Sequence, residues 1–205
     1  MKQYPTIPAK NKTGATHFWV FNKLDGSNIR AEWSKNRGFY KFGSRKRLLG
    51  TDQGLISKAS MLATIQEEKF REVFKIAKID RAICFFEFLG PNSFAGNHVD
   101  TDEHSLVLFD VDVYKHGLLN PGEFLKIFGE SNIEIPKLLH YGIIDQNIES
   151  LIHSGSLPGM GFEGVVCKAR RPKTFSEPIM YKIKNQAWID KVKANFDKSK
   201  WEELL

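Results

Sequence analysis

One short segment of the sequence places a lysine, a carboxylate and a glycine together at the end of a strand-like run. Lys23, Asp25 and Gly26 follow the apolar stretch His17–Phe21, which is typical of a buried strand, and they form a turn-like sequence. A lysine amine can attack phosphorus only in its neutral form, and its ordinary pKa is about 10.4. Nearby cations and burial lower that pKa. Lys182 and Lys184, two residues apart on one strand face, could supply such cations.

Two glutamates and one phenylalanine could serve the same chemistry. Glu87 lies inside the apolar run Ala82–Leu89, where a carboxylate is costly to bury without a partner. Carboxylate oxygens such as those of Glu87 and Glu163 suit a hard cation such as Mg²⁺, and an aromatic side chain such as Phe109 offers a flat face for stacking. A structural interpretation stays open for each: Glu163 can begin a strand, Phe109 can belong to the core, and Lys23 can be an ordinary turn lysine.

The segment Lys23–Arg30 resembles the K-x-D-G-x-x-x-R signature of the covalent nucleotidyltransferases, which are the DNA ligases, RNA ligases and mRNA capping enzymes. Further segments resemble the other motifs of that superfamily, in the same order, from Phe18 to Lys184. They are Gly43-Ser44-Arg45, Phe85-Phe86-Glu87-Phe88-Leu89-Gly90, Leu106-Val107-Leu108-Phe109-Asp110-Val111, Glu163-Gly164-Val165-Val166-Cys167-Lys168 and Tyr181-Lys182-Ile183-Lys184. The ordered series carries the resemblance, because the short K-x-D-G match alone is weak.

The resemblance implies a role for each matching residue. Lys23 would be the nucleophile that becomes adenylylated, and ATP with Mg²⁺ or Mn²⁺ would be the cofactors. The implied catalytic residues are Lys23, Glu163, Lys182 and Lys184. The implied nucleotide-binding residues are Leu24, Asn28, Arg30, Arg45, Glu87 and Phe109, and the implied metal ligands are Glu163 and Glu87. Arg45 lies in a basic run, Arg45-Lys46-Arg47, which could equally be a solvated loop, and Arg47 could take its place.

Ser27-Asn28 and Gly43-Ser44-Arg45 resemble the nick-sealing RNA ligase branch (RNA ligase 2 type) more than the DNA ligases. This branch implies an ATP-dependent RNA ligase that joins 5′-phosphate and 3′-hydroxyl ends. Few residues follow Lys184, so we expect a single nucleotidyltransferase domain over 1–205, without an OB domain or other C-terminal domain. The alternatives are a minimal DNA ligase, or a nucleotide- or RNA-end-binding module that has lost ligation. A protein partner could replace the missing domain.

Composition and charge agree with a polyanionic partner. The 205-residue chain has a net charge of +6 and 41% hydrophobic residues, so we expect a globular protein that binds RNA and possibly DNA. The apolar runs are too short to span a membrane and no leader-like stretch opens the sequence, so we expect a cytoplasmic protein without a membrane partner. Cys84 and Cys167 lie in apolar runs and are expected to be buried reduced thiols. The cysteines and histidines lack zinc-ligand spacing.

The elements that must position these residues are mostly strands. Ile29, Ala31 and Trp33 alternate with polar residues, which predicts a half-buried strand with a hairpin partner over 38–43. Apolar spacing predicts one amphipathic helix over 57–77, with Met61, Leu62, Ile65, Val73, Phe74 and Ala77 on its buried face. Further strands are expected at 82–89, 105–114, 163–168 and 179–183, and helices at 121–128, 145–153 and 186–196. The irregular order predicts an α+β fold of mainly antiparallel sheets flanked by helices.

Overall fold

The structure is a computed structural model that describes residues 1–45, 47–48, 55–91, 101–172, 177–199 and 201. These residues form two compact units. The first contains Met1–Pro5 and the described residues of 26–135, and the second contains Thr6–Asp25 and the described residues from 136 onward. Each unit is built on one antiparallel sheet, which confirms the predicted α+β class.

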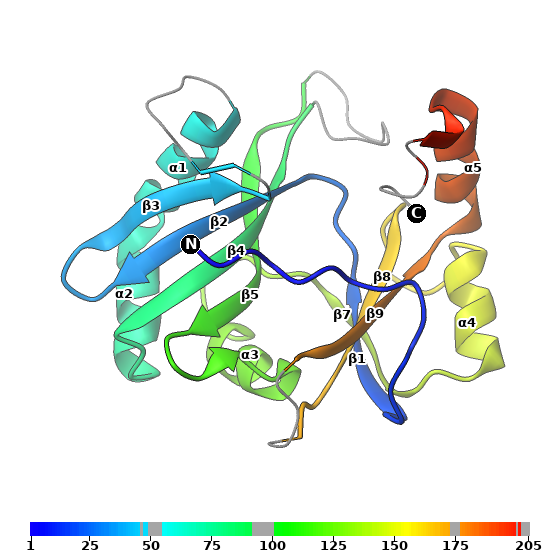
Figure 1. Ribbon diagram of the computed structural model, residues 1–205, viewed down its shortest axis with the longest axis horizontal. Coiled ribbons are helices and arrows are strands. Elements are labelled where there is room, and N and C mark those ends of the chain that lie inside the picture. Colours follow the sequence, from blue (N-terminus) through cyan, green and yellow to red (C-terminus); the bar gives the residue numbers. More distant parts are fainter. Residues whose placement is uncertain (46, 49–54, 92–100, 173–176, 200, 202–205) are drawn as a thin grey trace. The chain divides into compact units, whose positions relative to one another are not determined.

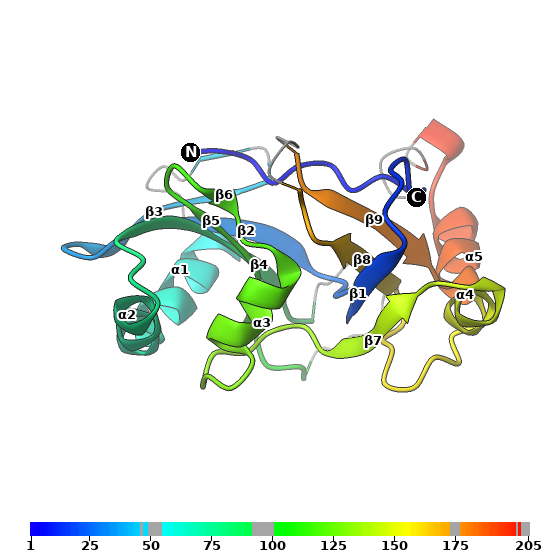
Figure 2. The same ribbon diagram turned by 90° about the horizontal axis from the view of Figure 1, so that it is seen from below.

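The first unit contains a five-stranded sheet with helices on one of its faces (Figures 1 and 2). The strand order is β3-β2-β4-β5-β6. The strands are β2 (Ser27–Ser34), β3 (Gly38–Ser44), β4 (Arg81–Leu89), β5 (Ser105–Val113) and β6 (Gly117–Leu118). The helices are α1 (Leu55–Ile65), α2 (Glu67–Ile76) and α3 (Pro121–Phe128). The opposite face of the sheet carries Asn28, Arg30, Glu87 and Phe109.

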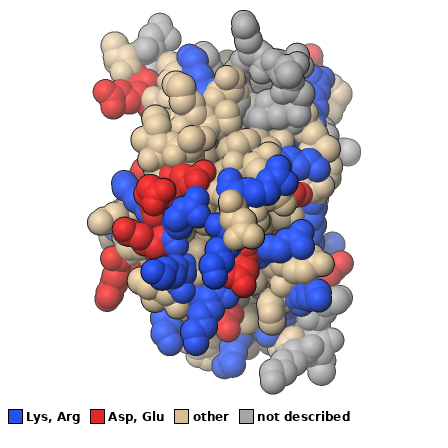
Figure 3. Space-filling model, turned by 90° about the vertical axis from the view of Figure 1, so that its left-hand side faces the viewer, with Lys and Arg blue, Asp and Glu red and all other residues tan. Residues whose placement is uncertain are grey.

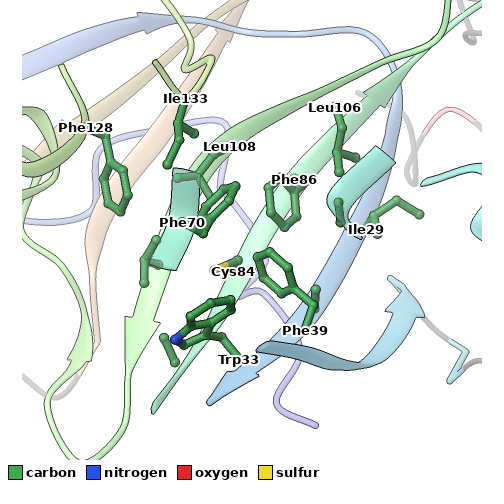
Figure 4. Close-up of a cluster of buried hydrophobic side chains, with 14 of the residues drawn as sticks. Ile29, Trp33, Phe39, Phe70, Cys84, Phe86, Leu106, Leu108, Phe128 and Ile133 are labelled. Carbon is green, nitrogen blue, oxygen red and sulfur yellow. The ribbon is translucent and has the colours of Figure 1, made fainter. Parts of the chain in front are cut away.

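Strand alternation explains the core of this unit. Ile29, Ala31 and Trp33 on β2 all point to the helix-covered face and are buried, as their period-two spacing predicted (Figure 4). Phe70 from α2 and Phe86 from β4 pack into the same cluster as edge-to-face aromatic pairs. The core therefore fixes which side chains of each strand remain on the other face.

The predicted single helix over 57–77 is wrong in two respects. The segment forms two helices, α1 and α2, with Gln66 between them. Met61 and Ile65, expected on the buried face, are exposed, whereas Ala59 and Ala63 of α1 and Phe70 and Phe74 of α2 are buried. The buried residues Ala59, Ala63, Phe70 and Phe74 follow the four- and seven-residue spacing of one helical face, and Met61 and Ile65 lie away from that face. The α3 prediction is confirmed, because Glu123 accepts a hydrogen bond from the Asn120 backbone at the N-cap.

The second unit contains a four-stranded sheet with the order β7-β1-β8-β9. Its strands are β1 (His17–Asn22), β7 (Leu138–Ile143), β8 (Gly164–Ala169) and β9 (Ile179–Lys184), and its helices are α4 (Gln146–His153) and α5 (Gln186–Asn195). The short edge strands β6 and β7 were not predicted. The side chain of Asp145 accepts a hydrogen bond from the Ile148 backbone and caps α4.

Both cysteines are free and buried, as expected. Among the described residues no helix is long and apolar enough to cross a membrane. The single domain expected over 1–205 stays a prediction.

Candidate active site

Lys23 directly follows β1 and is held by the backbone of β8. Its amide N–H donates to the Gly164 carbonyl (N···O 2.9 Å), which extends the β1–β8 pairing by one residue. Asn22 ties the same corner together, because its side-chain oxygen accepts from the Gly161 amide at 2.6 Å. The strand end therefore places the Lys23 side chain next to the residue that precedes Gly164.

That residue is Glu163, which contacts two lysines. Its Oε2 accepts from Lys23 Nζ at 2.8 Å, and its Oε1 accepts from Lys184 Nζ at 2.5 Å. Glu163 is only 5% exposed. Burial alone would raise the pKa of this carboxyl, but the charges of Lys23 and Lys184 outweigh burial and hold the pKa below its ordinary value. Glu163 is therefore an ionised, buried acceptor shared by two ammonium groups.

Local backbone geometry fixes Glu163 in this position. Gly164 has a φ of +130°, and a Cβ at that position would collide with the Ile183 carbonyl oxygen of β9. Only glycine tolerates both conditions. The Asn185 amide donates to the Glu163 carbonyl at 3.1 Å, and Asn185 also caps α5 through its side chain. The glycine after the glutamate is therefore a requirement of the fold as well as part of the motif.

Lys184 is 7% exposed, and its Nζ lies 3.5 Å from the ring centroid of Trp188 on α5. Burial lowers the Lys184 pKa to about 8; Glu163 opposes this shift, whereas the charges of Lys23 and Lys182 add to it. Lys182 lies two residues earlier on β9, and its amide donates to the Pro8 carbonyl at 2.9 Å. Trp188 was not predicted as a site residue, because an apolar side chain on a helix is indistinguishable in sequence from a core residue.

We name Lys23, Glu163, Lys182 and Lys184 the lysine–glutamate cluster. It contains three amines and one carboxylate, so positive charge is left over when all are ionised. Such a cluster suits a polyphosphate ligand, because phosphate oxygens supply the missing negative charge. Lys23 is the more accessible amine of the two bonded to Glu163, with 21% of its side chain exposed against 7% for Lys184. Of the two, Lys23 is better placed to reach a substrate.

In the first unit, Gly26 and Glu87 are bonded to each other. The Gly26 amide donates to Glu87 Oε1 at 3.0 Å, and a Cβ on Gly26 would come within 2.5 Å of the Phe88 carbonyl oxygen. Asn28 pairs directly with Glu87 across β2 and β4, so both project from the helix-free face of the sheet. The motif glycine therefore lets the chain pass close to β4.

Arg30 lies two residues after Asn28 on the same face and is 3% exposed. Its Nη1 donates to the Met1 carbonyl at 2.9 Å, whereas its Nε is buried and has no hydrogen-bond partner among the described residues. Burial lowers the Arg30 pKa, and the charge of Glu32 partly opposes that shift. Gly43 on β3 pairs with Arg30 on β2, and a Cβ at Gly43 would lie only 3.2 Å from the Arg30 Nε, so the glycine leaves space beside the guanidinium.

Phe109 occupies a β-bulge. Phe85 pairs with Asp110 and Phe86 with Leu108, so Phe109 is the extra residue on β5. Bulges re-aim side chains and are frequent beside active sites. The ring of Tyr4 meets Phe109 edge-on, with centroids 4.9 Å apart, and the Tyr4 hydroxyl donates to the buried Asp110 at 2.8 Å. Tyr4 was not predicted, because the sequence around it shows no motif.

The structure thus brings the predicted residues together in two groups. The lysine–glutamate cluster lies in the second unit, and Asn28, Arg30, Glu87 and Phe109 share a sheet face in the first. Leu24 is half-buried directly after Lys23, and Arg45 is exposed in the turn after β3. Lys46 lies outside the described residues. The catalytic and binding roles of all these residues stay predictions.

The described residues contain no group of three or more histidine, cysteine or acidic side chains that could hold a metal ion by themselves. Both Glu163 oxygens are already bonded to lysines, and Glu87 accepts from a backbone amide. One or two carboxylates do fit an ion that arrives with a nucleotide, since Mg²⁺ usually keeps waters and substrate phosphates among its ligands. The residues present therefore fit a substrate-borne divalent ion.

Comparison with solved structures finds the fold in RNA ligase from Naegleria gruberi. A variant of that enzyme with AMP and Mn matches with a TM-score of 0.66 at 18% identity, over 94% of this chain and 58% of that one. A variant with ATP and Mn and the enzyme with pyrophosphate each match with a TM-score of 0.62 at 18% identity, over 87% and 88% of this chain. In both cases 52% of the Naegleria chain is covered, so this chain spans about half of its length.

Comparison with curated protein sequences finds no significant match. The RNA ligase family model matches residues 16–184, which is most of the chain and includes every motif from Lys23 to Lys184. That match confirms the predicted superfamily, and the shared fold agrees with it. The chain belongs to the RNA ligase family.

Proposed function

We propose that the chain is an ATP-dependent RNA ligase that first transfers AMP from ATP to its own Lys23. The observation that carries this proposal is the lysine–glutamate cluster, in which a partly exposed lysine amine and a buried lysine share one buried carboxylate. The cluster has more amines than carboxylates, which favours binding of a triphosphate. Membership of the RNA ligase family supports RNA as the substrate.

The proposed reaction has three steps. The neutral Lys23 amine attacks the α-phosphorus of ATP, a P–N bond forms, the bond to the β-phosphate oxygen breaks, and pyrophosphate and the amine proton leave. The 5′-phosphate of RNA then attacks the phosphorus of the lysyl–AMP; the P–N bond breaks, the Lys23 amine takes up a proton, and an AMP-capped end forms. Finally the 3′-hydroxyl of RNA attacks the 5′-phosphate of that end, loses its proton and forms a phosphodiester, while the bond to AMP breaks and AMP leaves.

The other cluster residues would serve the first step. Lys182 and Lys184 would neutralise charge on the phosphates as pyrophosphate departs. Glu163 would orient both Lys23 and Lys184, and it must release Lys23 before the amine can attack. In the first unit, Asn28, Arg30, Glu87 and Phe109 would contact the nucleotide, with Leu24 and Arg45 as further contacts. A divalent ion held by substrate phosphates and by Glu163 or Glu87 would polarise the phosphate oxygens when bound.

Label transfer tests the first step directly. The protein is incubated with ATP labelled in the α-phosphate and with Mg²⁺ or Mn²⁺, and is then run on a denaturing gel. We expect a covalent adduct that Lys23→Ala abolishes, whereas Lys12→Ala, at an exposed lysine outside the cluster, keeps it. Wild-type protein that ATP never labels would refute the ligase proposal and leave a nucleotide- or RNA-end-binding module.

The choice of RNA over DNA needs a separate test. We expect nicked duplexes with ribose at the 3′-hydroxyl side and a pre-adenylylated 5′ end to be sealed faster than all-DNA nicks, because a 2′-hydroxyl offers a donor and an acceptor that DNA lacks. Equal or faster sealing of the DNA nicks would favour the minimal DNA ligase. Sealing that occurs only after a second protein is added would support the predicted partner.

A further inference from the structure

Three chain segments meet at one end of the five-stranded sheet of the first unit. Ser34 pairs with both Gly38 and Arg81, so the β2–β3 turn lies beside the start of β4. Ala82 pairs with Val113, which places the β5–β6 turn next to them. The motif residues of this unit lie toward the other end of the same strands. This turn end is therefore a surface separate from the residues assigned to AMP chemistry.

Cations and aromatic rings alternate across this end. The Arg37 guanidinium lies 4.2 Å above the centroid of the Tyr40 ring, and the Arg81 guanidinium lies 4.3 Å above that of Tyr114. Lys115 Nζ approaches the Tyr114 ring as well, at 5.6 Å. The Arg81 charge also acts on the Tyr40 hydroxyl, and it favours the ionised form of Tyr40 against the raising of its pKa by burial and by Glu32. We call Arg37, Tyr40, Arg81, Tyr114 and Lys115 the arginine–tyrosine ladder.

The ladder is open to solvent. Its three cations are exposed, and Tyr114 is 52% exposed. Figure 3 shows many Lys and Arg side chains, with Asp and Glu side chains among them, on the side of the molecule where the β2–β3 turn lies in Figure 1. Two carboxylates lie nearby: Asp80 is 3.8 Å from Lys35, and Glu32 lies beside Tyr40 of the ladder and 3.7 Å from the N-terminal ammonium, so the three cations of the ladder outnumber the one carboxylate that faces it. The ladder therefore presents a net positive, aromatic surface.

Both components of this surface match a nucleic-acid strand. A guanidinium stacked on a ring is held in place and still offers its N–H edges to phosphate oxygens. An exposed tyrosine face can stack an unpaired base, and bases stack on aromatic side chains with little regard to sequence. An acidic peptide would use the charges but leave the rings without a role. Interleaved cations and rings favour a single-stranded or splayed polynucleotide.

The ladder also continues the sheet face that carries Glu87. Arg81 and Glu87 are both on β4, six residues apart, so their side chains project to the same side. At about 3.3 Å per residue they are roughly 20 Å apart along the strand. Met1 and Tyr4 cover the face between them, because Met1 accepts a hydrogen bond from Arg30 and Tyr4 packs against Phe85, so the ladder is a surface of its own at the end of the sheet.

We propose that the arginine–tyrosine ladder is a docking surface for RNA, where Arg37, Arg81 and Lys115 contact the phosphate backbone and Tyr114 stacks an unpaired base. The proposal rests on the proposed function only for the choice of RNA as the polynucleotide. Binding at the ladder requires neither ATP nor a reactive Lys23. It would hold the strand that flanks the end to be joined.

The test measures binding of a fluorescently labelled RNA oligonucleotide by anisotropy over a range of salt concentrations. The ladder variant combines Arg37→Glu with Lys115→Glu, and the matched control combines Lys10→Glu with Lys12→Glu, two exposed lysines of the second unit. We expect the ladder variant to bind about ten-fold or more weakly. Its slope of log affinity against log salt should be shallower by about 1.4–1.8, since each lost phosphate contact contributes about 0.7–0.9. The control should keep the wild-type slope.

A second variant separates stacking from charge. Tyr114→Ala should weaken binding of single-stranded RNA about five-fold or more without changing the salt slope, because a base stack releases no counterions. Wild-type affinity in both ladder variants, or an equal loss in ladder and control pairs, would overturn the proposal. Thermal melting checks that the variants are folded.

Label transfer from ATP distinguishes failure of this proposal from failure of the proposed function. The ladder variant should be labelled at Lys23 as fast as wild type, because neither Arg37 nor Lys115 belongs to the lysine–glutamate cluster. A wild-type protein that is never labelled but binds RNA through the ladder would refute the ligase and keep the docking surface. If wild-type protein is labelled by ATP and the ladder variant binds RNA as tightly as wild type, the docking surface is refuted and the ligase proposal stands.

Discussion

Trp188→Leu should narrow the pH range in which AMP is transferred to Lys23. The reason is that the indole ring stabilises the Lys184 ammonium through a cation–π contact, so loss of the ring lowers the Lys184 pKa. The Lys184 ammonium lies 3.5 Å from the ring centroid, and both residues are buried. A cation–π contact in a desolvated place is worth about 2 kcal/mol, and one pKa unit corresponds to about 1.4 kcal/mol. Loss of the ring should therefore move the Lys184 pKa from about 8 down by about 1.5.

The lower Lys184 pKa should reduce the rate of AMP transfer at neutral and alkaline pH. A pKa near 8 keeps about three quarters of Lys184 charged at about pH 7.5, whereas a value lower by about 1.5 leaves about a tenth. If charged Lys184 is needed as pyrophosphate departs, label transfer at about pH 7.5 should fall about eight-fold, with little change at about pH 6. Glu163, Lys23 and Lys182 also act on this ammonium, and they are the same in both proteins.

The assay is single-turnover label transfer from ATP between about pH 6 and 9. Trp188→Phe is the matched control, because it keeps an aromatic face under the ammonium and should shift the alkaline limb much less. The melting temperature of each variant shows how much stability is lost with the packing of the Trp188 side chain. The reasoning fails if the alkaline limb of the pH–rate profile is the same for Trp188→Leu and for wild type. It also fails if both variants lose activity equally at every pH, because Trp188 would then contribute only packing.

Three further outcomes follow from the same contacts. Gly164→Ala should destabilise the fold by about 2 kcal/mol or more in denaturant titration, whereas Gly14→Ala, with open space around it, should be close to neutral; equal stabilities would contradict the steric argument. The Glu163 pKa is depressed, so its stabilising contribution is present above about pH 4.5 and lost as pH falls further; Glu163→Gln should melt with a weaker acid dependence than wild type. Tyr4→Leu should raise the KM for ATP more than Tyr4→Phe, which keeps the ring against Phe109; equal KM values would exclude a positioning role.

The parts of the fold that the sequence predicted are those with local signals. The β2 alternation of Ile29, Ala31 and Trp33 depends only on strand geometry, and the start of α3 depends only on contacts within one turn. The buried face of α1 carries only the small residues Ala59 and Ala63, whereas the larger Met61 and Ile65 are exposed, so the size of the apolar residues indicated the wrong face. Edge strands such as β7 bury few side chains, so their apolar pattern is weak.

The candidate site was predictable as a set of residues but not as an arrangement. Lys23 and Glu163 are 140 positions apart, and nothing in their spacing shows that they form an ion pair. The β-bulge at Phe109 depends on the register of two strands, so only the structure reveals how that ring is turned. Tyr4 contacts Phe109 and Trp188 contacts Lys184 in the folded chain, and the sequence around Tyr4 and Trp188 shows no motif that would predict these contacts.

Glu163 can be both the structural start of a strand and a residue of the candidate active site, and the lysine–glutamate cluster shows how. Gly164 and Asn185 hold Glu163 at the start of a strand, as a purely structural residue would be held. The same backbone aims its carboxylate at two lysines, of which Lys184 is buried and charged at a cost in free energy. The burial of the Lys184 charge lowers the stability of the unliganded protein, and a polyphosphate bound as we propose would offset that loss, because a ligand that binds the folded state stabilises it.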